Sequence, residues 1–422
     1  MSRCPCPWNL VAISCIHFKS KEQKFLWDYF THVASRIFDC YDSIPTDYDP
    51  RHSALLPAMG SFDATLLSSI LAFSAYCLQM TGYAGEYGAR ASSLFSEAFN
   101  SLTVSLTEDW IATEAMLPPL AAALLLYHCG GPNFSSLLSL ARGAAIRISQ
   151  VDNSFREDLR CQSLFALLAW TDVCTINAIA APTVAATPAE DSDTETAASI
   201  LPIVQAITSQ ENLCPDFGSW VTHPIYAFSQ KLIKPMMQIG RLAKLRTSAT
   251  AAIQITELNE KIEMVELDLL EAYKEDTKSY EDGTSSDPGE LMHVNVAMHA
   301  AASIMAYSRL RDTPWTSTHI RRQVATIIDE AKQVTAGSAA TRALVFPLFI
   351  AGCEALDGAS RDFIGMRLGD CHRLDPFQPA KITDRMRKVW EIRDNDPGLN
   401  WLQWTTELHS HTLEDGQNMI VW

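Results

Sequence analysis

Apolar residues recur every three or four positions along most of this chain, and this spacing limits the possible folds more than any other feature. The clearest example runs from residue 253 to residue 273, where six apolar side chains share one helical face and charged residues, mostly glutamates, occupy the rest: Ile255, Leu258, Ile262, Val265, Leu269 and Ala272. No run alternates between apolar and polar residues as a half-buried strand does. The pattern predicts an all-α protein.

Further helices are predicted on both sides of this one. In the first half they are expected at 21–40, 62–80, 87–106, 114–128, 134–150 and 157–180, and in the second half at 291–311, 317–336, 343–356, 360–368 and 383–393. Two segments rich in small, polar and acidic residues, 181–199 and 275–289, are interpreted as surface linkers. We expect one large multi-helical domain over residues 21–410, a poorly packed terminus at 1–20 and a tail at 411–422.

Composition limits the partners that the chain can have. Its 33 basic and 49 acidic residues give a net charge of -16, so its overall field repels phosphate backbones and anionic membrane surfaces. No run reaches the roughly 18 to 20 apolar residues of a membrane helix. The first 20 residues imitate a secretory signal poorly, because they have no cleavage site of small residues. A soluble intracellular protein without direct nucleic-acid binding is expected.

Cysteine and histidine spacing gives no sign of a metal site. The eleven cysteines include no Cys-x-x-Cys, whereas a binuclear zinc cluster needs six thiolates in two closely spaced triplets. His293 and His299 are six positions apart and His409 and His411 two apart, so neither pair has the i, i+4 spacing of two ligands on one helical face. No phosphate-binding loop or dinucleotide fingerprint is present either. We therefore expect no metal and no cofactor.

Several segments carry a family resemblance. The strongest combines PLFIAGCEA at 347–355 with Arg361 and with Val389 and Trp390, and weaker ones are FLWDYF at 25–30, LLSSILAFSA at 66–75 and LLAWTDV at 167–173. Together they resemble the fungal-specific transcription factor domain of the second type, the all-helical region that follows a binuclear zinc cluster in many fungal regulators. The resemblance covers roughly residues 21–410. The family's DNA contacts belong to the zinc module, whose cysteine pattern this sequence does not contain.

The strongest of these segments also holds a candidate ion pair. Glu354 lies seven residues before Arg361, too far for pairing along one helix but close enough to meet it across a turn at Asp357 and Gly358. We expect a structural ion pair between them. Pro347 suits the first turn of the helix, and Gly352 permits the close approach of another helix.

Two interpretations stay open for the polar residues within the apolar helices. Asp172 interrupts a strongly apolar helix, where a carboxylate is costly unless it is paired with Arg142 or Arg147 or hydrogen-bonded to a hydroxyl. Alternatively Asp172, Arg142 and Trp170 belong to an internal ligand pocket. His128 is interpreted as a cap or core histidine, with an acid or base role as the alternative. Five tryptophans are interpreted as packing residues, of which a subset could line a cavity: Trp170, Trp315, Trp390, Trp401 and Trp404.

The resemblance implies a transcription regulator-like protein without a DNA-binding domain of its own. Such a protein would act in the nucleus, or in the cytoplasm, and would control a fungal secondary-metabolite gene cluster through partners in the transcription machinery or through a sensed small molecule. The alternative is a cofactor-independent cyclase or isomerase of natural-product biosynthesis that holds a reactive intermediate in the same helical scaffold. Its candidate catalytic residues are Asp172, His128 and Arg142.

Overall fold

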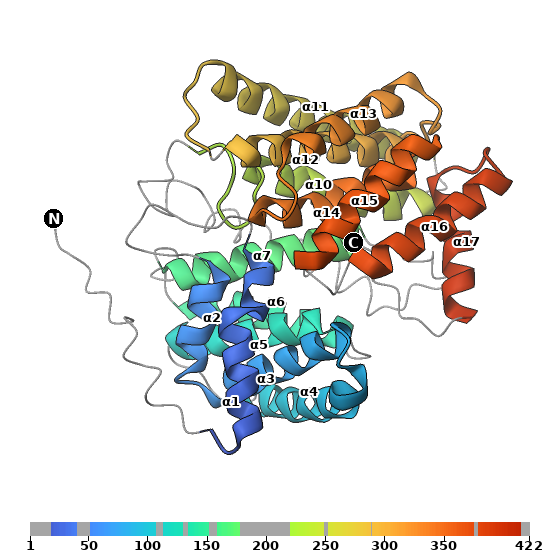
Figure 1. Cartoon of the computed structure of the whole chain (residues 1–422). Coiled ribbons are helices and arrows are strands. Elements are labelled where there is room, and N and C mark those ends of the chain that lie inside the picture. The colour runs from blue at the N-terminus through green and yellow to red at the C-terminus, as the bar shows by residue number, and fades with distance from the viewer. Residues whose placement is uncertain are drawn as a thin grey trace. The chain divides into compact units, whose positions relative to one another are not determined.

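The computed structural model describes residues 18–39, 51–106, 113–129, 134–151, 158–177, 220–248, 252–287, 289–374 and 379–414. Every regular element within these ranges is a helix, which confirms the all-α prediction (Figure 1). The chain divides into two compact units, one made mainly of residues up to 168 and the other mainly of residues from 169 onward. The prediction of one continuous domain over 21–410 stays a prediction.

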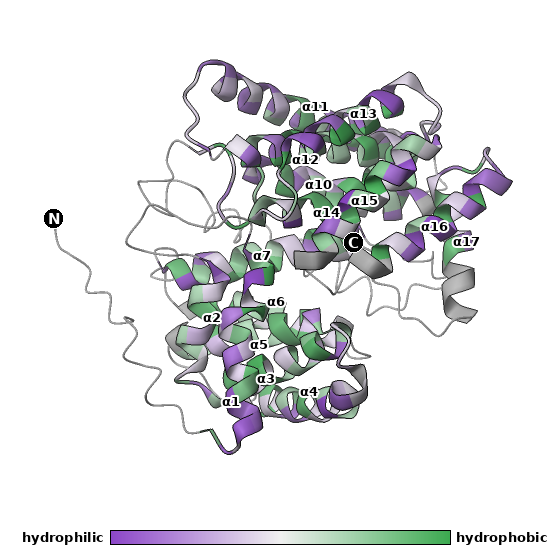
Figure 2. Cartoon of the chain, in the orientation of Figure 1, coloured by the Kyte–Doolittle hydropathy of each residue, from purple (hydrophilic) through white to green (hydrophobic). Residues whose placement is uncertain are grey.

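The first unit is built around α3 (Ala64–Met80), which contacts most of its neighbours. Asp63 starts this helix by accepting a hydrogen bond from the Leu66 amide at 2.7 Å. The other helices of the unit are α1 (Lys21–His32), η2 (Ala34–Phe38), α2 (His52–Gly60), α4 (Ala84–Leu106), α5 (Thr113–His128), α6 (Phe134–Val151) and α7 (Leu159–Ile176) as far as Leu168. Almost all of α5 from Met116 onward is buried, which explains why it is apolar on every side. Figure 2 colours the helices by hydropathy and shows apolar and polar residues along the helices of each unit.

The second unit is organised around α12 (Gly289–Leu310), which contacts five other α-helices. Its buried alanines at 297, 300, 301, 302 and 306 present little bulk, so neighbouring helices approach it on several sides. The surrounding elements are η5 (Gln230–Leu232), α10 (Ile233–Ser248), α11 (Ala252–Glu281), α13 (Thr318–Gln333), η6 (Ala339–Leu344), α14 (Val345–Cys353), α15 (Gly358–Leu374), α16 (Pro379–Asn395) and α17 (Trp401–Glu414). No helix of the described ranges is both long enough and apolar enough to cross a membrane.

Helix α11 begins within one residue of its predicted start at residue 253 but extends beyond its predicted end at residue 273. It continues to Glu281, so the first seven residues of the expected linker at 275–289 are helical. The acidic residues Glu275 and Asp276 of that segment instead pair with basic residues on η5 and α12, as described below. Near its start Ile255 is 45% exposed, whereas the other five residues of the predicted apolar face are buried. The second expected linker, 181–199, and the expected termini, apart from residues 18–20 and 411–414, lie outside the described residues.

Two sequence predictions about α14 are confirmed. Pro347 lies in the first turn of this helix, where the missing amide hydrogen is not needed. Gly352 lies against α16, and a methyl group at its Cα would collide with the sulfur of Met386. The Trp390 indole also donates a hydrogen bond of 2.7 Å to the Gly352 carbonyl. Glycine therefore allows α14 and α16 to come close enough for this bond.

Candidate functional site

Glu354 follows α14 directly, and its carboxylate pairs with Arg393 of α16. Oε2 of Glu354 lies 2.8 Å from Nη1 of Arg393, and both side chains are almost completely buried. Arg361 instead binds Asp394 through two hydrogen bonds of 2.6 and 2.7 Å. The predicted pair of Glu354 with Arg361 is therefore wrong. The sequence spacing suggested a local partner, but α16 supplies both partners from two consecutive positions.

The end of α14 is held by side chains from three other helices. Helix C-termini leave carbonyl groups without partners, and cationic side chains are favoured there. Four successive backbone carbonyls accept hydrogen bonds from side chains here, one from a tryptophan and three from arginines. The pairs are Gly352 with Trp390, Cys353 with Arg393, Glu354 with Arg321 and Ala355 with Arg361. The segment that carries the strongest resemblance is therefore the point where α13, α15 and α16 are joined to α14.

Three tryptophans surround two of the buried arginines in this region. The Arg393 guanidinium carbon lies 4.0 Å from the Trp315 ring centroid and 5.7 Å from that of Trp404. The Arg309 guanidinium carbon lies 4.5 Å from the centroid of Trp401. An aromatic face attracts a cation, and the attraction grows where water is excluded. These rings therefore offset part of the free-energy cost of burying the two guanidinium groups.

A cavity of about 200 Å³ lies beside these groups. Its buried floor includes Ser308, Trp315, Glu354 and Arg393, while Pro314, Thr316 and Pro397 at its rim are exposed. A second hollow of about 10 Å³ shares Ser308, Glu354 and Trp401 with the cavity and reaches Arg309 and Trp404. The smaller hollow has room for about one water molecule. We call the larger space the Arg393 cavity.

Two local features position the wall of the Arg393 cavity. The Trp315 indole donates a hydrogen bond of 3.1 Å to the Pro397 carbonyl, which fastens the loop before α17. Asn400 then starts α17 through a reciprocal cap with Gln403, with bonds of 2.8 and 3.0 Å. Trp401 is the first residue of this helix and lines the cavity.

Positively charged groups outnumber negatively charged ones around Glu354. Burial lowers the pKa of Arg309 to about 10, and the nearby Glu354 carboxylate opposes this change. Burial also lowers the pKa of Arg321, which lies close to both Glu354 and Arg393. Three guanidinium groups thus lie near the Glu354 carboxylate, and Asp357 is a second carboxylate near Arg321. Asp312 at the cavity rim forms an ion pair with Arg246.

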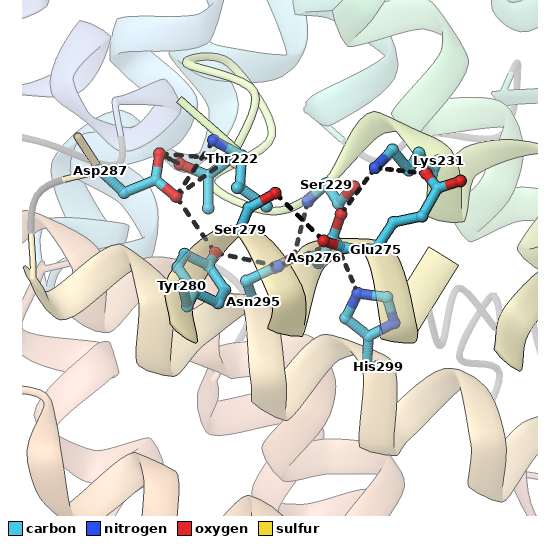
Figure 3. A network of polar contacts seen from close by, with 11 residues as sticks. Thr222, Ser229, Lys231, Glu275, Asp276, Ser279, Tyr280, Asp287, Asn295 and His299 are labelled. Atoms are coloured by element: carbon cyan, nitrogen blue, oxygen red, sulfur yellow. Dashed lines mark hydrogen bonds and ion pairs between the residues drawn. The ribbon is translucent and has the colours of Figure 1, made fainter. Parts of the chain in front are cut away.

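A separate polar network joins α11, α12 and the segment that precedes η5 (Figure 3). Asp276 of α11 lies at its centre and accepts bonds from Lys231 at 3.0 Å and from Asn295 at 3.1 Å. Nε2 of His299 lies 2.8 Å from the same carboxylate. The Asn295 side chain also accepts a hydrogen bond of 2.7 Å from the Ser229 amide. The network therefore ties the segment before η5 to two long helices.

The same network continues to the loop between α11 and α12. Asp287 accepts a hydrogen bond of 2.9 Å from the Thr222 hydroxyl and another of 3.1 Å from Tyr280. Burial raises the pKa of Asp287 and of Tyr280. Burial alone would also raise the pKa of Asp276, but His299, Asn295 and Lys231 together lower it. Neither hollow described above is lined by these residues, so the network is best explained as a clamp that fixes the fold.

The predicted site residues are divided between the two units. Trp170 and Asp172 belong to the second unit, whereas Arg142 and His128 belong to the first. Trp170 packs edge-on against Phe228 and Phe346, with centroids 5.2 and 5.3 Å away, so its packing role is confirmed. Asp172 is 1% exposed, and the pairing of its carboxylate with Arg142 stays a prediction. Arg147, the other predicted partner, donates a hydrogen bond of 3.1 Å to the Leu106 carbonyl.

His128 has the environment of a core histidine. Its ring lies 5.3 Å from that of Phe38, and its Nε2 is buried without a hydrogen bond in the part of the chain that the structure describes. Burial, with a smaller contribution from the nearby His52, lowers its pKa to about 4. His52 is also buried, its pKa is lowered to about 4, and its Nε2 lies 3.1 Å from the Ser163 hydroxyl.

The sequence left open which tryptophans line a cavity, and it gave no sign of the charged part of the Arg393 cavity. Trp315 and Trp401 line this cavity, whereas the pocket candidates Trp170, Asp172 and Arg142 line neither of the two hollows described above. Arg309 and Arg393 were not singled out, because their spacing gives no sign that they share a partner. Among the described residues, no three His, Cys, Asp or Glu side chains are grouped as metal ligands would be.

Comparison with known proteins agrees with the resemblance found in the sequence. The family model described as the fungal specific transcription factor domain matches residues 24–414. The chain belongs to this family. No curated protein and no solved structure matches it. The family match extends over the described helices of both units, from α1 to α17.

Proposed function

We propose that this member of the fungal transcription factor family controls a secondary-metabolite gene cluster in the nucleus, acting through partners in the transcription machinery. The observation that carries the proposal is the family match over residues 24–414 in a sequence without the cysteine pattern of a binuclear zinc cluster. The net charge of -16 supports action through protein partners, since it disfavours direct contact with DNA.

The Arg393 cavity supports a second part of this proposal, which is control by a sensed small molecule. It combines aromatic side chains with a few charged groups, as ligand pockets commonly do. It also lies where α12, α14, α16 and α17 meet, so a bound molecule would contact several helices at once. A ligand that binds one arrangement of these helices better than another would shift the protein toward that arrangement.

Gene deletion in the producing fungus tests the regulatory role. Loss of the cluster's transcripts, with recovery when the gene is restored, is the expected result. Unchanged transcripts together with an accumulated biosynthetic intermediate would overturn the proposal and favour the cyclase or isomerase alternative. In that case Asp172→Asn, His128→Gln and Arg142→Gln would be assayed for slower consumption of the intermediate.

A gel-shift experiment tests the need for partners. The purified chain is expected to bind cluster promoter DNA no more tightly than unrelated DNA of the same length. Tight, sequence-selective binding that weakens steeply with salt would show that the chain holds DNA itself. The same assay with nuclear extract added identifies whether a partner brings the chain to the promoter.

A further inference from the structure

The Arg393 guanidinium uses only part of its hydrogen-bonding capacity. Nη1 makes both of its bonds, to the Cys353 carbonyl and to Glu354, each at 2.8 Å. Its Nε is buried without a hydrogen bond, and Nη2 has no acceptor among the residues that the structure describes. Arg393 is 3% exposed and lines the cavity. Arg393 therefore lines a space large enough for a ligand, and within the described residues Nη2 is its one unused donor that is not enclosed by protein.

The charge balance around this space favours an anion. Arg393 lines the space, and Arg309 and Arg321 lie near the same carboxylate of Glu354. Asp357 is a second carboxylate near Arg321, so three cationic groups are balanced by two anionic ones. Asp312 at the rim is already paired with Arg246. Buried charge is unfavourable unless it is compensated, and cation–π contacts supply only part of the compensation. An anionic ligand would supply the rest.

The shape and lining of the cavity limit the kind of anion. Trp315 and Trp401 provide flat aromatic surface, and the volume of about 200 Å³ is somewhat larger than that of a cavity known to hold benzene, about 150 Å³. A carboxylate oxygen accepts a strong, charge-assisted hydrogen bond from a guanidinium, and Nη2 of Arg393 is the donor left for it. A single aromatic ring that carries a carboxylate satisfies both requirements.

We propose that the Arg393 cavity binds a small aromatic carboxylate, with the carboxylate at Arg393 and the ring against Trp401. The proposal deepens the sensing role described above and rests on it for its biological meaning. The two fail separately, because binding is measured on the purified chain and regulation is measured on transcripts. The cavity could take up the ligand even if the transcripts proved independent of the gene.

Titration calorimetry of the full chain with benzoate is the direct test. Benzamide, which has the same ring without the charge, is expected to bind at least about tenfold more weakly, because a hydrogen bond to a charged group is the stronger kind. Inorganic phosphate tests whether any anion suffices, and it is also expected to bind at least about tenfold more weakly than benzoate, since it lacks the ring.

Two substitutions locate the binding. Arg393→Gln is expected to weaken benzoate binding roughly tenfold to a hundredfold. Because this change also disturbs the pair with Glu354, a second variant avoids the buried core. Thr316→Trp places an indole at the exposed rim of the cavity and is expected to lower affinity at least about tenfold by obstruction. Thr318→Trp is the matched control, since Thr318 is exposed but does not line the cavity.

The outcomes separate clearly. Benzoate binding that is lost in Thr316→Trp and retained in Thr318→Trp, with benzamide and phosphate weaker, supports the proposal. The absence of benzoate binding at millimolar concentration overturns it. Equal binding of benzamide or phosphate, or binding that Thr316→Trp leaves unchanged, overturns it as well, because the charge, the ring or the location would then be wrong.

Discussion

Glu354 and Arg393 form an ion pair whose two side chains are only 4% and 3% exposed. Removing one partner leaves the other charge buried, so Glu354→Gln and Arg393→Gln should each lower the free energy of unfolding by about 3 to 5 kcal/mol. The double variant should lose less than the sum of the two. Denaturant unfolding of the four proteins measures this coupling. Additive losses would contradict a direct interaction.

Arg361 and Asp394 provide a surface pair for comparison. The Asp394 side chain is 53% exposed, so water competes with the ion pair. Asp394→Asn should therefore change the free energy of unfolding by less than about 1 kcal/mol. Combining Glu354→Gln with Arg361→Gln should show a smaller coupling than combining Glu354→Gln with Arg393→Gln, since Glu354 and Arg361 have different ion-pair partners. A strong coupling between them would restore the pairing predicted from the sequence.

Asp276 should contribute more to stability than its neighbour Glu275, although both bind Lys231. Asp276 is 1% exposed and also interacts with His299 and Asn295, whereas the Glu275 side chain is 54% exposed. Asp276→Asn should cost about 1 to 3 kcal/mol, and Glu275→Gln less than about 1 kcal/mol. Thermal or denaturant unfolding distinguishes the two. Equal losses would mean that the buried network adds nothing beyond a surface charge pair.

A larger side chain at Gly352 should destabilise the protein while Met386 is present. A methyl group at Gly352 meets the Met386 sulfur, so Gly352→Ala should cost about 1 to 3 kcal/mol through forced displacement. Gly369→Ala on α15 is the control, because a methyl group there meets no atom within 4 Å. That change should stabilise the helix by about 0.5 to 1 kcal/mol. If both variants unfold at the same denaturant concentration, the close approach of α14 and α16 is not constrained.

His52 and His128 should make the first unit less stable in acid. Burial lowers the pKa of both groups to about 4, whereas a histidine in the unfolded chain titrates near about 6.5. The unfolded state therefore binds more protons between these values, and stability falls as the pH drops from about 6.5 toward 4. Amide hydrogen exchange in α3 and α5 measures this loss. Below about pH 4 the histidine contribution should level off.

A substitution isolates this effect. His128→Leu should reduce the dependence of first-unit stability on pH by about one proton over the same range. His293→Gln is the control, because His293 belongs to the second unit and pairs with Glu330 on α13. It should leave the exchange of α3 and α5 unchanged. An unaltered slope in His128→Leu would show that this histidine is not buried as a neutral group.

The sequence predicted elements better than partners. Helical spacing identified α11 from its buried face of Leu258, Ile262 and Val265, because burial of one stripe leaves a periodic signal. The predicted helix ended too early, because the acidic residues after Tyr273 have the composition of a linker. Their partners Lys231 and His299 come from other elements, so the sequence around residue 275 does not show them. Likewise Glu354 has an obvious partner in sequence at Arg361 and its actual partner 39 positions away at Arg393. Pairing across helices leaves no periodic signal.

The four hydrogen-bonded carbonyls at the end of α14 also limit which substitutions related proteins can accept at the donor residues. Their donors Arg321, Arg361, Trp390 and Arg393 come from three helices, yet they serve one short stretch of backbone. Loss of one donor leaves a carbonyl that no change of the accepting residue can repair, because every residue carries the same carbonyl. We expect relatives that alter one of these donors to alter another nearby in compensation, so that the four positions evolve as a group.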